Sequence, residues 1–165
     1  MLPMKDPENI ESWRKQYNRT LERYNMLVLY GPSKTGKTMW SRQAFGNREE
    51  CFEVNCSSGA EPHMRGFNWF KHKWILLDEA KPKQILANKK FFHAQPVECT
   101  MGASATKMHA YDAYCHKTPM IICSNDWKKL ERRENKADKE WLATNCCIRK
   151  VVEPLYVEVN VDPES

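Results

Sequence analysis

One run of eight residues near the start of the chain carries a strong chemical signal: Gly31, Pro32, Ser33, Lys34, Thr35, Gly36, Lys37 and Thr38. It matches the pattern G-x-x-x-x-G-K-[ST], in which glycines let successive backbone N–H groups point toward one phosphate. Lys37 can reach the β- and γ-phosphates of a nucleotide, and the Thr38 hydroxyl can bind Mg²⁺. An apolar run, Met26–Tyr30, precedes it and a helix over about 37–45 is expected after it. This context predicts a nucleotide-binding loop, called the phosphate loop below.

Two acidic residues, Asp78 and Glu79, follow the apolar run Trp74–Leu77. Adjacent acids at the end of a buried strand suit nucleotide hydrolysis, because the first can hold Mg²⁺ and the second can activate the attacking water. A kinase needs no residue that activates water, so Glu79 favours hydrolysis over phosphate transfer to a metabolite. We therefore expect Asp78 to bind the metal and Glu79 to be catalytic.

A third apolar run, Met120–Cys123, ends in Ser124 and Asn125. An Asn after a strand is often only a turn residue. If this strand lies beside the strand of the phosphate loop, however, Asn125 would face the γ-phosphate. In that case Asn125, with Lys37 and Glu79, completes the predicted catalytic set by positioning the water.

Length and composition bound the class of protein. The chain has 165 residues, of which 41% are apolar and 28% charged, as in a single water-soluble globular domain. No apolar run approaches the ~20 residues of a membrane span, and the N-terminus carries no signal-peptide pattern. Seven cysteines without a C-x-x-C pair indicate free thiols in an intracellular, reducing compartment. Zinc at Cys51 and Cys56, or at Cys115 and His116, is disfavoured because no second pair has structural-zinc spacing.

The positive charge is clustered. The net charge is +5. Residues 63–90 contain seven Lys or Arg and two acidic residues, whereas every charged residue within 151–165 is acidic. Such clustering fits either a polyanionic partner or an ordinary solvated surface. Trp69 and Phe70 lie beside Lys71 in this basic region. They could form a base-stacking patch, but we expect them, like Trp74, to pack in the core.

The first residues read as an amphipathic helix over 6–24. Asp6 can cap it and Pro7 suits its first position. Five apolar residues recur at helical spacing and should face the core: Ile10, Trp13, Tyr17, Leu21 and Tyr24.

The remaining pattern alternates strands with helices and predicts an α/β fold with a central, largely parallel sheet. A β-hairpin is expected from Val97–Thr100 and residues 106–114, and residues 127–136 read as a charged, exposed segment. A further strand is expected at 51–54, a β-prone stretch broken at Pro154 at 147–159, and helices at 84–93 and 138–145. This organisation divides the chain into an N-terminal helix (1–25), an ATPase domain (26–160) and a tail (161–165).

The three motifs in this order resemble the superfamily-3 helicase domain, and especially the ATPase half of Rep proteins from circular single-stranded DNA viruses and plasmids. The resemblance covers about residues 25–156 and rests on Gly31–Thr38, Ile75–Glu79 and Met120–Asn125. It implies an AAA+-like P-loop NTPase with a three-layer sandwich, which hydrolyses ATP with Mg²⁺. It also implies a homo-oligomeric ring, commonly a hexamer, that moves along single-stranded DNA or unwinds a duplex. RNA remains an alternative substrate, and a Rep of the eukaryotic-virus type would act in the host nucleus.

The resemblance also implies residues outside the three motifs. The family carries a pore hairpin that grips DNA; here it would be Val97–Tyr114, with Lys107 and His109 as the candidate DNA contacts. Ring ATPases place an arginine of one subunit on the γ-phosphate of the next. Arg132, Arg133 and Arg149 are the candidates, and the sequence does not choose among them.

The chain departs from the family pattern near the hairpin tip, where Met101-Gly102 stands in place of Lys-Gly, and it also departs from full-length Rep proteins. It has no His-x-His pair, and only 25 residues precede the first predicted strand. We therefore expect no DNA-nicking activity. Two alternatives stay open: a small P-loop kinase, and a nucleotide-binding remnant without motor activity.

Overall fold

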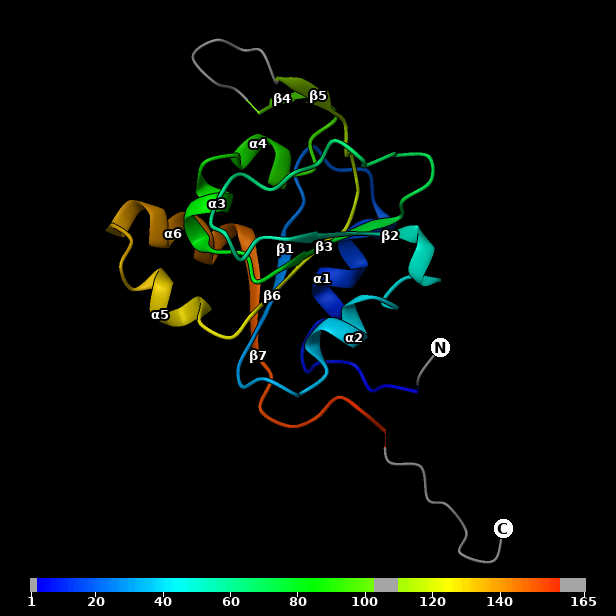
Figure 1. Cartoon of the computed structure of the whole chain (residues 1–165), viewed down its shortest axis with the longest axis vertical. Helices are drawn as coiled ribbons and strands as arrows, with labels where there is room; N and C mark the ends of the chain where they lie inside the picture. Colours follow the sequence, from blue (N-terminus) through cyan, green and yellow to red (C-terminus); the bar gives the residue numbers. More distant parts are fainter. Residues whose placement is uncertain (1–2, 103–109, 158–165) are drawn as a thin grey trace, which may run out of the picture.

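The computed structural model describes residues 3–102 and 110–157. At its centre lie five parallel strands: β1 (Met26–Tyr30), β2 (Cys51–Asn55), β3 (Trp74–Asp78), β6 (Met120–Ser124) and β7 (Cys146–Lys150). Their order across the sheet is β2-β3-β6-β1-β7 (Figure 1). Two shorter strands, β4 (Cys99–Met101) and β5 (Tyr111–Ala113), form a separate antiparallel hairpin. The predicted α/β fold with a parallel central sheet and a hairpin is confirmed.

The apolar strand runs produce this sheet because neighbouring side chains point to opposite faces, and both faces are buried. Met26 and Val28 of β1 belong to one core cluster, whereas Leu27 and Leu29 belong to the other. In β6, Ile121 and Ile122 divide in the same way. A sheet buried on both sides has to be covered by helices on both sides.

Helices cover the two faces unequally (Figure 1). The face of Leu27 packs against α1 (Glu11–Lys15) and α2 (Lys37–Ser41), through Trp13 and Trp40. The opposite face lies under four helices: α3 (Pro82–Leu86), α4 (Lys89–Phe92), α5 (Trp127–Glu131) and α6 (Lys136–Asn145). Two 3₁₀ turns, Gln16–Asn18 and Arg48–Glu50, complete the regular elements of the described residues.

The N-terminal helix is much shorter than the predicted 6–24. It begins at Glu11, and the 3₁₀ turn that continues it ends at Asn18. Asp6 does not cap the helix; its carboxylate accepts hydrogen bonds from Arg14 and from the Trp40 indole. The chain then turns back, so that the Asn25 carbonyl accepts from the side chains of α1 and its 3₁₀ turn. The predicted apolar stripe does reach the core, but from two antiparallel segments instead of one helix.

Three other helix predictions need correction. The helix after the phosphate loop ends at Ser41, and the helix predicted over 84–93 is split between α3 and α4. The segment 127–136, predicted as exposed, contains α5, whose Trp127 is completely buried. The many charged residues of this segment led to the prediction that it is exposed. Burial of the one large apolar side chain, Trp127, is nevertheless enough to hold a short helix against the core.

The two ends of the described chain meet beside the phosphate loop. Residues 3–5 and 155–157 pair through an antiparallel bridge between Met4 and Tyr156, and the Lys5 amide donates to the Leu155 carbonyl at 2.9 Å. The Leu155 amide in turn donates to the Thr35 carbonyl at 2.8 Å. We call this pair of segments the terminal strap. The break predicted at Pro154 within 147–159 falls between β7, which ends at Lys150, and the strap segment 155–157.

Two findings bear on the environment of the protein. Within residues 3–102 and 110–157, no helix has the length and apolar character that crossing a lipid bilayer requires. All seven cysteines are free thiols, as the sequence predicted.

Gly31 joins β1 to the phosphate loop and provides a test of this packing. Its φ is +137°, and a Cβ there would overlap the carbonyl oxygen of Val151. We expect Gly31→Ala to destabilise the fold by about 2–5 kcal/mol, from positive-φ strain together with overpacking. Gly59→Ala is the matched control, because Gly59 has a φ of +80° but its Cβ would meet only the Lys81 ammonium at 3.4 Å. Urea unfolding measures both, and equal losses would contradict this account of Gly31.

Candidate functional site

The three sequence motifs line one cavity of about 240 Å³. The phosphate loop supplies Ser33, Lys34, Gly36, Lys37 and Thr38. Asp78 and Glu79 enter from the end of β3, and Asn125 enters from the end of β6. This convergence follows from the strand order, because β6 lies between β1 and β3 and the carboxyl ends of parallel strands share one edge of the sheet. The condition set for Asn125, that its strand neighbour the strand of the phosphate loop, is met.

The phosphate loop curls around the Lys37 ammonium. Lys34 and Gly36 have positive φ angles of 64° and 87°, which turn the backbone sharply. The Lys37 ammonium donates to the Gly31 carbonyl at 3.1 Å and to the Pro32 carbonyl at 2.6 Å. Burial lowers the pKa of Lys37, and the nearby Asp78 carboxylate opposes this shift. The loop thus binds the Lys37 ammonium through carbonyl oxygens, and an anion entering the cavity would compete with these carbonyls for the ammonium.

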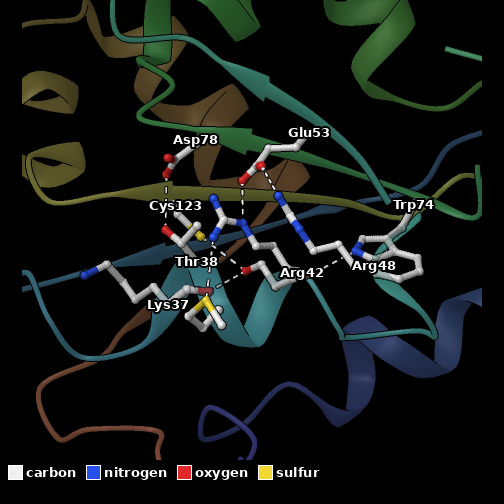
Figure 2. Close-up of polar contacts among 10 residues, drawn as sticks. Lys37, Thr38, Arg42, Arg48, Glu53, Trp74, Asp78 and Cys123 are labelled. Atoms are coloured by element: carbon white, nitrogen blue, oxygen red, sulfur yellow. Dashed lines mark hydrogen bonds and ion pairs between the residues drawn. The ribbon is translucent and has the colours of Figure 1, made fainter. Parts of the chain in front are cut away.

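Two oxygen atoms at the cavity could hold a magnesium ion. The Thr38 hydroxyl donates to the Asp78 carboxylate at 3.3 Å, which links the start of α2 to the end of β3 (Figure 2). Mg²⁺ is usually held by one or two protein oxygens, with the phosphates of its substrate and water completing the coordination. Thr38 and Asp78 present two such oxygens, and their role as metal ligands stays a prediction.

The surroundings of the Asp78 carboxylate disfavour its negative charge. Burial raises its pKa above the ordinary value of 3.8; the hydrogen bond from Thr38 opposes this shift, and the negative charges of Glu79 and Glu53 add to it. A divalent cation between Thr38 and Asp78 would relieve the excess negative charge, so the site is poised to attract one.

Glu79 adopts a strained backbone conformation. Its φ is +59°, which is rare for a non-glycine residue and costs on the order of 1–3 kcal/mol. Its amide donates to the Cys123 carbonyl at 2.7 Å, which ties the end of β3 to β6. Glu79 and Asn125 also line an adjoining cavity, formed with Lys81, Asp126 and other residues. These two side chains therefore stand between two hollows, where a water molecule could approach a phosphate.

The short helix α2 is held in place by contacts that the motifs do not reveal. The Trp74 indole donates to the Ser41 carbonyl at 2.7 Å, and Ser41 donates back to the Lys37 carbonyl (Figure 2). Arg42 forms an ion pair with Glu53 of β2 at 2.8 Å, and Arg48 reaches the same carboxylate at 3.1 Å. A helix of five residues needs such anchors, because so short a helix is unstable alone.

Four further residues of the cavity lie outside the predicted set: Met39, Cys123, Ser124 and Tyr156. The Cys123 thiol lies 3.2 Å from the Ser41 hydroxyl, and burial raises its pKa to about 12, so it stays neutral at pH 7. Tyr156 reaches the cavity from the terminal strap. No motif could identify Tyr156, because only the path of the chain after β7 brings it there.

The candidates for an arginine that acts between subunits differ in their surroundings. The Arg149 guanidinium donates to the carbonyl of Asn9 at 2.8 Å and to that of Ile148 at 2.9 Å. Arg132 and Arg133, in contrast, are exposed just after α5. Lys107 and His109, the candidate DNA contacts, lie outside the described residues.

An aromatic groove lies beside the hairpin β4–β5, defined by Arg65, Phe67, Trp69, Phe70 and Tyr114. Phe70 is 92% exposed and Trp69 is 41% exposed, so the prediction that they pack in the core is wrong. Trp74 is fully buried, as predicted. The Trp69 ring contacts Phe70 and Tyr114 edge-on, and its indole donates to the His116 carbonyl at 2.8 Å. These contacts hold the Trp69 ring in place at the surface.

Comparison with known protein families finds no family model that matches the chain.

Asp78→Asn tests the electrostatics of the cavity without disturbing its shape. The folded state raises the pKa of Asp78, so ionisation of this carboxylate lowers the free energy of unfolding. This loss of stability is complete above the pKa of the folded state and disappears below the pKa of the unfolded chain. We expect Asp78→Asn to raise the melting temperature at pH 7 and to lose this advantage as the pH falls toward 3.8. Thermal melts of both proteins across this pH range measure the difference in melting temperature. A variant that is less stable than the wild type at pH 7 would contradict the inference that the Asp78 charge destabilises the fold.

Proposed function

We propose that this chain is a P-loop ATPase with an AAA+-like fold, similar to the superfamily-3 helicase domain of Rep proteins, and that it hydrolyses ATP with Mg²⁺ on single-stranded DNA. The observation that carries the proposal is the single cavity shared by the phosphate loop, the two acids and Asn125. The chain draws these residues from three strands and one loop, and the chemistry of each suits one part of phosphoryl transfer to water.

The roles follow from position. The phosphate loop and Lys37 hold the β- and γ-phosphates and offset their charge. Thr38 and Asp78, which are already in contact, would hold Mg²⁺, which would offset the negative charge that develops on the phosphates during transfer. Glu79 takes the proton from the attacking water, and Asn125 orients that water, because both side chains flank the boundary between the two adjoining cavities.

Hydrolysis is favoured over the kinase alternative by a specific feature. Glu79 is held at the cavity by a strained backbone and a 2.7 Å hydrogen bond, and strain of this kind gathers at functional sites. A kinase would have no use for a carboxylate that activates water at this place.

The aromatic groove supports single-stranded nucleic acid as the partner. Exposed aromatic rings stack on unpaired bases, and each stacked base contributes about 1–3 kcal/mol. Exposed Arg65 and Lys71 lie in the same region, although Glu98 and Asp112 also line the groove. Stacking should therefore outweigh phosphate contacts in binding.

The groove and the cavity lie at opposite ends of the same two strands. Trp69 precedes β3 and Tyr114 precedes β6, whereas Asp78 ends β3 and Asn125 follows β6. In Figure 1 the hairpin beside the groove is at the top and the phosphate loop is at the bottom. DNA on the groove could thus bias the ends of β3 and β6, which gives a physical route for stimulation by DNA. Ring assembly, with Arg132 or Arg133 supplied to a neighbouring cavity, belongs to the same proposal.

Lys37→Ala tests the cavity. We expect a loss of ATP turnover of at least about 100-fold, because the phosphates lose the buried cation that faces them. Lys90→Ala, which removes an exposed lysine of α4, serves as the control and should retain turnover. Turnover is measured by phosphate release with and without single-stranded DNA, alongside particle size. Undiminished turnover in Lys37→Ala would refute the site, and turnover that requires a metabolite instead of DNA would favour the kinase.

Replacing Trp69 and Phe70 together by Ala tests the groove. We expect single-stranded DNA to bind at least about 10-fold more weakly, since two stacking platforms are lost. Val152→Ala, which trims another exposed apolar residue, should bind DNA normally. Fluorescence anisotropy with labelled DNA and RNA measures both and compares the two nucleic acids. Unchanged affinity would place the nucleic-acid contact elsewhere.

A further inference from the structure

The ring of Tyr156 lies against the phosphate loop. A Cβ added to Gly36 would come within 3.0 Å of the ring and within 2.9 Å of the Met4 side chain. Tyr156 also lines the cavity together with Met39, beyond the residues that face the phosphates. The loop therefore carries, on its outer side, an aromatic ring that the phosphate chemistry does not use.

The ring is held there by backbone contacts. Tyr156 pairs with Met4 in the antiparallel bridge, and the neighbouring Leu155 amide donates to the Thr35 carbonyl. None of these contacts needs the phenol ring, and Tyr156 as a whole residue is 43% exposed. A large, half-exposed aromatic ring beside a phosphate-binding loop is positioned to contact a ligand more than to support the fold.

A nucleotide in this loop has to extend its base beyond the phosphates. The phosphates occupy the loop interior near Lys37, and the sides facing Asp78 and Asn125 are given to the metal and water. The remaining lining residues that offer apolar surface are Met39 and Tyr156. A flat base that met them would stack on the ring of Tyr156 and contact the thioether of Met39.

We propose that Tyr156 is the base-binding residue of the site, and that it takes a purine nucleotide by stacking its ring on the base. The inference rests on the proposed function, because it assumes that the phosphate loop holds a nucleotide. Purines are favoured over pyrimidines because they offer the larger stacking surface. The terminal strap thereby becomes part of the nucleotide site, since it sets the position of the ring.

The experiment compares two ligands that share their phosphates. Isothermal titration measures the binding of Mg-ATP and of inorganic tripolyphosphate with Mg²⁺ to the wild-type chain and to Tyr156→Ala, Tyr156→Leu and Tyr156→Phe. We expect ATP to bind the Ala and Leu variants about 10-fold more weakly, whereas tripolyphosphate binds all four proteins equally. Tyr156→Phe should bind ATP like the wild type, because it keeps the ring. Val152→Ala, on the segment that leads to the strap, is the control.

The other outcomes separate the two proposals. ATP affinity that is unchanged in both Tyr156→Ala and Tyr156→Leu overturns the base contact. Equal weakening of ATP and tripolyphosphate also overturns it, since the ring would then act only by supporting the loop. Wild-type protein that binds tripolyphosphate as tightly as ATP overturns the base contact and leaves the phosphate loop standing. Wild-type protein that binds neither ligand overturns the proposed function itself.

Discussion

The register of three parallel strands is the constraint on which the rest of this structure depends. β1 and β3 both pair with β6, so that Tyr30 lies opposite Ser124 and Asp78 lies opposite Cys123. This register brings the phosphate loop, the acids and Asn125 to the same edge of the sheet. A slip of one residue would turn every side chain of a strand to the other face. Both faces of the sheet are apolar, so the close packing of particular side chains within each cluster, and not burial alone, opposes such a slip.

Polar and strained groups at this edge are held by the same buried frame. The Glu79 amide is bonded to Cys123 of β6, and the Val151 amide, just beyond β7, donates to the Tyr30 carbonyl at 2.7 Å. Gly31 then passes so close to Val151 that no side chain fits. Backbone strain at Lys34 and Glu79 persists because these surroundings leave the chain no relaxed alternative. The apolar core thus supplies the free energy that keeps an unfavourable arrangement of charges in place.

The sheet also relates the two surfaces that carry the proposed chemistry. A strand is stiff along its length, and β3 and β6 each connect the side of the aromatic groove with the side of the cavity. The proposed stimulation by DNA would act along these two strands, which lead from the groove to Asp78 and Asn125. The terminal strap adds a second connection, because both ends of the described chain meet on the phosphate loop.

The sequence by itself determined the features that depend on neighbouring residues: the phosphate loop, the acids at the end of β3, Asn125 at the end of β6 and the parallel character of the sheet. Each depends on a short run of apolar residues followed by polar ones, so the local sequence pattern is sufficient to predict it. Tertiary structure decided the rest. The helix expected over 6–24 folds back at Asn18, the rings of Trp69 and Phe70 lie at the surface, and Glu53 anchors α2 through Arg42. Tyr156 reaches the cavity from a segment far along the chain. These features arise from contacts between distant segments, whose free energies outweigh the local preferences that a sequence displays.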